Sequence, residues 1–113
     1  MEPQIELVQA SERVSVLTPK GRLDRTTASA FRERVLRLVH DGHIRMVVDC
    51  SEISFIDSGG LGSIVASLKV ARQLEGDVRI ACVTDQMRVV LRLTALGAVL
   101  KSYASVEEAV ADF

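Results

Sequence analysis

The organisation of the chain is clearest where an apolar run leads into a serine and two glycines. Residues 44–62 have the sequence IRMVVDCSEISFIDSGGLG. The run 44–50 is apolar on both faces of an extended chain, which is typical of an inner strand of a sheet. From Ser58 to about residue 75 apolar residues recur at helical spacing, which predicts a helix. A buried strand followed by a helix indicates an α/β domain.

The remaining sequence alternates between strand patterns and helix patterns. Alternating or apolar runs predict strands at residues 4–9, 13–17, 78–83 and 99–103. Helical spacing predicts further helices at residues 25–40, from residue 84 and from residue 105. We therefore expect one domain over residues 1–113, with a mixed sheet of four to five strands and about four helices.

Local signals predict where some of these elements begin and end. Asp24 or Thr26 is placed to cap the helix at 25–40, Thr84 to cap the third helix, and Ser105 to begin the last one. Because proline has no N–H group to donate, Pro19 predicts that the second strand ends, bulges or lies at a sheet edge there.

The composition excludes several classes of protein. The chain has 113 residues, 48% of them apolar, which is enough for one core. A net charge of −1 argues against a nucleic-acid-binding surface. The first residues do not resemble a signal peptide, and no window is long enough to span a bilayer. We expect a cytoplasmic protein with no direct nucleic-acid partner and no membrane partner.

The cysteines and histidines do not form a recognisable metal motif. Cys50 and Cys82 lie in apolar runs, which is typical of buried, reduced thiols. His40 and His43 flank a predicted turn, and neither has a cysteine close to it in sequence. No P-loop fingerprint is present, although this leaves nucleotide binding open. We expect no cofactor.

The junction at residues 54–62 carries the chemistry of the chain. Loops at the carboxyl ends of strands usually hold the functional residues of α/β proteins. Gly59 and Gly60 are each unfavourable in a helix by roughly 1 kcal/mol relative to alanine. They indicate that another backbone comes close and that the Ser58 hydroxyl stays accessible. A compatible interpretation is a helix cap, in which Asp57 or Ser58 binds the first free amides.

An enzyme with Ser58 as its nucleophile is the alternative that the motif itself suggests. Asp-Ser-Gly-Gly also surrounds the nucleophile of chymotrypsin-like proteases, which are all-β proteins about twice this length with an upstream histidine. Here the histidines lie at a helix end and the pattern is α/β. The sequence offers no evident base for Ser58, so we do not expect an enzyme.

Four segments together resemble the anti-sigma factor antagonists, a family of STAS-domain proteins. Residues 57–62, DSGGLG, are similar to the family signature, in which Asp-Ser and usually a further Ser or Thr lead into Gly-Leu-Gly. Residues 21–24, GRLD, resemble its Gly-x-Leu-Asp element. Residues 47–49, VVD, and 83–84, VT, also match in kind and spacing. The resemblance extends from about residue 5 to about residue 110.

The resemblance implies a regulatory protein that is not an enzyme. The unphosphorylated form would bind an anti-sigma factor with serine kinase activity and so free the sigma factor. Phosphorylation at Ser58 would end that complex, and a metal-dependent, PP2C-like serine phosphatase would restore it. Gly59 stands where the family usually has Ser or Thr, so Ser58 is the only acceptor in the loop. The implied partner-binding residues are Asp24, Asp57, Ser58, Gly59, Gly60, Leu61 and Gly62.

Two further interpretations remain open at this point. The chain could instead be a non-catalytic STAS scaffold subunit of a stress-signalling complex or of a lipid-transport system. Arg22, Arg25 and Arg32 could be contacts at the rim of the partner surface, although a solvated helix face is the favoured interpretation of these charges.

Overall fold

The computed structural model describes residues 4–11 and 13–113. Within these residues six strands form one sheet: β1 (Gln4–Gln9), β2 (Ser15–Leu23), β3 (Arg45–Asp49), β4 (Ile53–Ile56), β5 (Asp77–Ala81) and β6 (Ser102–Tyr103). Four α-helices and one 3₁₀ helix accompany them: α1 (Ala28–His40), α2 (Ser58–Gln73), α3 (Asp85–Leu93), η1 (Ala95–Val99) and α4 (Val106–Ala111). The predicted mixed α/β architecture is confirmed.

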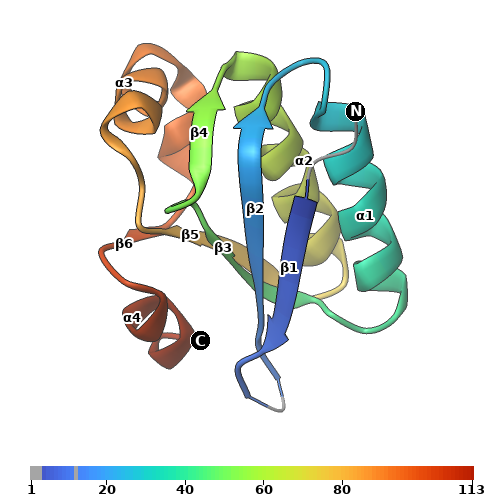
Figure 1. Ribbon diagram of the computed structural model, residues 1–113. Coiled ribbons are helices and arrows are strands. Elements are labelled where there is room, and N and C mark those ends of the chain that lie inside the picture. The colour runs from blue at the N-terminus through green and yellow to red at the C-terminus, as the bar shows by residue number, and fades with distance from the viewer. Residues whose placement is uncertain (1–3, 12) are drawn as a thin grey trace.

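The sheet has the order β1-β2-β3-β5-β6, and β4 pairs with the C-terminal part of β2. Strand β1 is antiparallel to β2, whereas the other pairings are parallel. Helices α1 and α2 lie together on one face of the sheet (Figure 1). The main core lies between them and the strands. Helix α4 covers part of the opposite face, where Ala109 packs with Val47 and Ala81 in a smaller core.

The sheet has six strands rather than four to five because β4 was not expected. Strand β2 continues past Pro19 to Leu23 and changes neighbours on the way. It pairs with β3 up to Leu17 and with β4 from Gly21 onward, so Pro19 falls between the two ladders. The missing N–H is tolerated there. The register shifts only between Gly21 and Arg22, two residues beyond Pro19, where the sequence had predicted the irregularity.

The predicted helix starts are confirmed except at α1. Thr84 accepts a hydrogen bond from the N–H of Met87 and Ser105 accepts one from the N–H of Glu108, as caps do. Helix α1 begins after Thr27, whose side chain makes no capping bond, so the expected cap by Asp24 or Thr26 is wrong. Those two residues are hydrogen-bonded to each other instead.

The last predicted strand and one of the cysteines also differ from expectation. Residues 99–103 were expected to be a strand, but η1 extends to Val99 and β6 contains only Ser102 and Tyr103. Cys50 is fully buried, and burial raises the pKa of its thiol to about 12. Cys82 follows the end of β5 and is only half-buried. Both thiols are free.

The helices of the described residues are not membrane-spanning segments. None of those within 4–11 and 13–113 is both long enough and apolar enough to cross a bilayer.

Candidate functional site

Ser58 is the first residue of α2 and follows β4 after a single residue. Strands β2 and β4 are parallel, with Leu23 opposite Ile56, so both end at the same edge of the sheet. Figure 1 shows this edge at the top of the view, beside the start of α2. Ser58 is exposed there. The Ser58 hydroxyl is therefore accessible at the edge of the sheet where the parallel strands have their carboxyl ends.

Asp57 fixes the conformation of this loop. One carboxylate oxygen, Oδ1, accepts a hydrogen bond of 2.8 Å from the N–H of Gly60 and caps α2. The other, Oδ2, accepts one of 3.3 Å from the N–H of Arg25, which follows the end of β2. The same side chain thus joins the start of the helix to a segment 32 residues upstream. The predicted helix cap is confirmed, and of the two candidates, Asp57 and Ser58, the capping residue is Asp57.

Gly60 allows α2 to begin directly against the end of β2. A Cβ atom added to Gly60 would lie 1.9 Å from the carbonyl oxygen of Leu23, which no real side chain could do. At Gly59 an added Cβ would lie 3.0 Å from the Cβ of Arg25. At Gly62 nothing lies within 4 Å. The expectation that another backbone comes close to the glycines is confirmed: at Gly60 it is the end of β2, and at Gly59 it is Arg25, whose Cα would lie 3.1 Å from an added Cβ.

The predicted partner-binding residues differ in what they present to solvent. Ser58 is exposed, and Asp57, Gly59 and Gly62 are half-buried. Gly60 is buried, and the side chain of Leu61 is fully buried in the main core. The surface of this loop therefore consists of Ser58 with Asp57, Gly59 and Gly62, whereas Gly60 and Leu61 hold the helix in place.

Asp24 lies next to the loop, but its carboxylate bonds to its own turn. Oδ1 accepts hydrogen bonds from the hydroxyl (2.5 Å) and the N–H (2.9 Å) of Thr26, and Oδ2 accepts one from the Nε of Arg22 (3.1 Å). The side-chain hydrogen bond from Thr26, with further help from Arg22, lowers the pKa of Asp24 to about 2. The Arg22 guanidinium also stacks over Phe55, 4.4 Å from the ring centroid. Asp24 therefore remains an anion that keeps the turn rigid.

Gln86 supports the loop from α3 and was not singled out from the sequence. Its Oε1 accepts a hydrogen bond of 2.9 Å from the N–H of Ile56, and its Nε2 donates one of 2.7 Å to the Ile56 carbonyl. One side-chain amide thus satisfies both backbone groups of the last residue of β4, as a neighbouring strand would. Ile56 lies two positions before Ser58, so Gln86 positions the loop.

A serine and a histidine do meet in this fold, but far from Ser58. The Oγ of Ser15 lies 2.7 Å from the Nδ1 of His43 at the opposite end of β2. Ser15 is only 1% exposed, so its hydroxyl is not open to a substrate. Within residues 4–11 and 13–113 no group of three or more His, Cys, Asp or Glu side chains could hold a metal ion.

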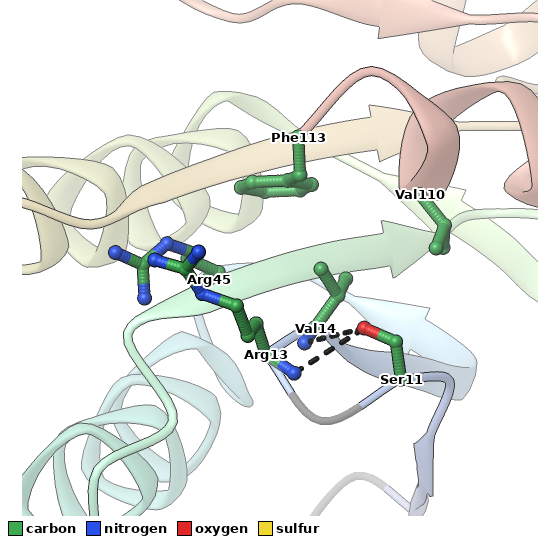
Figure 2. A pocket seen from close by; sticks show the side chains of 6 residues that line it. All are labelled: Ser11, Arg13, Val14, Arg45, Val110 and Phe113. Carbon is green, nitrogen blue, oxygen red and sulfur yellow. Dashed lines mark hydrogen bonds between the residues drawn. The ribbon is translucent and has the colours of Figure 1, made fainter.

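A small cavity of about 220 Å³ also lies at that opposite end of the sheet. It is lined by Ser11, Arg13, Val14, Arg45, Val110 and Phe113. Figure 2 shows the side chains of Arg13 and Arg45 below the ring of Phe113 in the view drawn. None of these residues belongs to the Ser58 loop, so the cavity is not part of the candidate site.

Comparison with known proteins identifies the family of this chain. The family model of the STAS domain matches residues 7–109. The anti-sigma-B factor antagonist of Staphylococcus aureus is 30% identical over 76 residues, which are 67% of this chain and 70% of that protein.

Solved structures agree with the sequence matches. The crystal structure of TM1081 from Thermotoga maritima is 26% identical and superposes with a TM-score of 0.84, covering 97% of this chain and 92% of that one. The structure of SpoIIAA from Bacillus in its phosphorylated form has a TM-score of 0.72 at 21% identity, covering 96% and 98% of the two chains, and shares the fold. The chain therefore belongs to the STAS domain family, and the Staphylococcus relative that it matches is an anti-sigma factor antagonist.

Proposed function

We propose that this chain is an anti-sigma factor antagonist that is switched off by phosphorylation of Ser58. In its unphosphorylated form it binds an anti-sigma factor that is also a serine kinase, and so releases the sigma factor. The kinase transfers the γ-phosphoryl group of ATP to the Ser58 oxygen, with release of ADP and of the hydroxyl proton. A metal-dependent, PP2C-like phosphatase hydrolyses the phosphoserine. The protein itself performs no catalysis and acts in the cytoplasm.

The observation that carries this proposal is the exposed Ser58 hydroxyl on a loop held from three sides. Asp57 bonds to Arg25 and to Gly60, and Gln86 holds the last residue of β4. The hydroxyl stands at the start of a 16-residue helix, whose first backbone amides favour an added negative charge. A kinase can thus reach the hydroxyl without unfolding any element.

The fixed loop also suggests how the phosphate acts. Phosphorylation adds about −1.5 to −2 charges at pH 7. The helix amides favour this charge while the Asp57 carboxylate opposes it, so the fold should change little. A partner surface fitted to a neutral hydroxyl would instead meet a bulky anion. A hundredfold loss of affinity needs only about 2.7 kcal/mol, which one poorly paired phosphate at an interface can supply.

The test is capture of partners by variants that differ at one exposed serine. Ser58→Asp, Ser58→Ala and wild type are used to pull proteins from a lysate of the source organism, with mass spectrometry as the readout. Ser54→Asp is the matched control, because Ser54 is an exposed serine on the neighbouring strand β4. We expect wild type, Ser58→Ala and Ser54→Asp to retain a kinase-like anti-sigma factor that Ser58→Asp loses.

Incubation of the protein with the same lysate and ATP tests the modification directly. We expect phosphate to map to Ser58 and to be lost in Ser58→Ala. Equal capture by all four proteins, especially of other STAS proteins or of transporter subunits, would contradict the proposal and support a scaffold role.

A further inference from the structure

Gly59 and Arg25 form a contact that the family pattern does not provide for. The family usually has Ser or Thr at the position of Gly59. Here an added Cβ would lie 3.0 Å from the Cβ and 3.1 Å from the Cα of Arg25, which is closer than most real Cβ contacts. A side chain at position 59 would therefore fit only if Arg25 moved by a few tenths of an ångström.

The backbone of Arg25 is fixed where it meets the loop. Its N–H donates to Oδ2 of Asp57, 3.3 Å away. The turn around it is closed by two hydrogen bonds to the carbonyl oxygen of Asp24, from the N–H groups of Thr27 (3.0 Å) and Ala28 (2.8 Å). The stem of the Arg25 side chain is thus held beside the residue that follows Ser58.

Within the described part of the chain, the guanidinium of Arg22 is engaged by other groups, whereas that of Arg25 is not. Arg22 is paired with Asp24 and stacked over Phe55. Arg25 is exposed, and its guanidinium makes no ion pair or hydrogen bond with the residues that the structure describes. An arginine is charged at any physiological pH, and its planar fork binds phosphate through two hydrogen bonds.

We propose that Arg25 binds the phosphate of phosphorylated Ser58, and that Gly59 leaves the room that this contact requires. The inference rests on the proposed phosphorylation and specifies what the modified loop does. The phosphate is received by a residue of the same chain, so Arg25 is drawn away from the partner surface. Modification then changes that surface twice, since an anion is added and a cation is withdrawn.

The two segments that meet at this edge supply charges of both signs, and α3, which packs against β4, adds Asp85 and Arg88, which pair with each other. The Asp57 carboxylate and the ionised Asp24 oppose it, and Arg22 is already engaged with Asp24. The α2 amides favour it. Arg25 supplies the free positive charge in this balance.

The test is the second ionisation of the phosphoserine, followed by ³¹P NMR. Phosphoserine is incorporated at position 58 during translation, so no kinase is needed. The second pKa of a phosphoserine is ordinarily about 6. We expect it to be about 0.5 higher in Arg25→Gln than in wild type, which is what loss of an exposed ion pair produces. Arg37→Gln removes the same charge from the last turn of α1 and should leave the titration unchanged.

Gly59→Ala supplies an independent perturbation of the same contact. Its methyl group pushes against Arg25 without removing the charge, so its phosphate should titrate between wild type and Arg25→Gln. Arg25→Lys keeps the charge but loses the planar fork. Its phosphoserine pKa should therefore lie between those of wild type and Arg25→Gln. Two-dimensional NMR spectra of the unphosphorylated variants check that each one is folded.

Identical titration of wild type and Arg25→Gln would overturn the inference. A shift of the same size in Arg37→Gln would do so too, because it would reflect net charge alone. Either result leaves the proposed function intact, since that depends on partner capture. Conversely, failure of Ser58→Asp to release a partner would overturn the proposed function without altering the titration.

Discussion

Replacing Gly60 with alanine places a methyl group where the backbone of β2 ends. The new Cβ would lie 1.9 Å from the carbonyl oxygen and 2.6 Å from the carbonyl carbon of Leu23, whereas unstrained carbon contacts are about 3.5–4.0 Å. A flexible side chain could move aside, but here the obstacle is a strand backbone that also pairs with β4. Either α2 or the end of β2 must therefore shift.

The magnitude follows from two opposing terms. Alanine in place of glycine in a helix gains roughly 1 kcal/mol. Extra volume in a closely packed site costs about 1–3 kcal/mol and occasionally more, and this clash with backbone belongs at the upper end. We therefore expect Gly60→Ala to lower the free energy of unfolding by about 2 kcal/mol.

Gly62→Ala is the matched control, because it makes the same chemical change two residues further along the same helix. An added Cβ there has nothing within 4 Å, so only the gain in helix propensity remains. We expect its free energy of unfolding to rise by about 0.5–1 kcal/mol. Effects on the unfolded chain are shared by the two variants, so their difference, about 3 kcal/mol, isolates the packing against Leu23.

Urea denaturation followed by far-ultraviolet circular dichroism measures this difference. The midpoint should move in opposite directions for the two variants, with little change in the slope of the unfolding free energy against urea concentration. Equal midpoints, or a Gly60→Ala protein as stable as wild type, would refute the close approach of helix and strand. An unchanged Gly62→Ala midpoint would refute only the propensity argument.

Three further outcomes are expected from the same structure. Because hydrogen bonds from its own turn hold the pKa of the Asp24 carboxyl at about 2, below its ordinary 3.8, this group favours folding above about pH 4. Denaturation series should therefore show wild type losing more stability than Asp24→Asn as the pH falls from 4 to 2; parallel losses would count against this pairing. Gln86→Ala should cost about 1–3 kcal/mol in urea melts by leaving two backbone groups of β4 unpaired, whereas Gln73→Ala, at the exposed end of α2, should change stability by less than about 0.5 kcal/mol. In timed alkylation with iodoacetamide, half-buried Cys82 should react before Cys50, which burial keeps protonated and covered; earlier labelling of Cys50 would contradict its placement.

The sequence predicts those features of this site that depend on near neighbours. The start of α2, its cap by Asp57 or Ser58 and the exposure of Ser58 all follow from residues within one helical turn. The glycines indicate that some backbone comes close, but only the fold identifies it as Leu23, 37 residues before Gly60.

Features that depend on distant partners could not be predicted. Strand β4 has only four residues, and its pairing exists because β2 runs past Pro19 and needs a new neighbour there. The cap expected at Asp24 or Thr26 is wrong for a local reason, because Thr26 and Arg22, each two residues away, bond to the Asp24 carboxylate before α1 begins. Nothing in the local pattern around Gln86 indicates that its amide completes the edge of β4.

These distant contacts explain why the Ser58 loop suits a switch that leaves the fold unchanged. Asp57 ties the loop to the end of β2, Gly60 seats the helix against the same strand, and Gln86 closes β4 from the other side. Each contact involves backbone atoms or buried groups and none involves the Ser58 hydroxyl, so a phosphate can be added or removed without breaking any of them. Phosphorylation then changes only interactions at the surface, namely the repulsion of a partner and the proposed pairing with Arg25, and the fold stays the same.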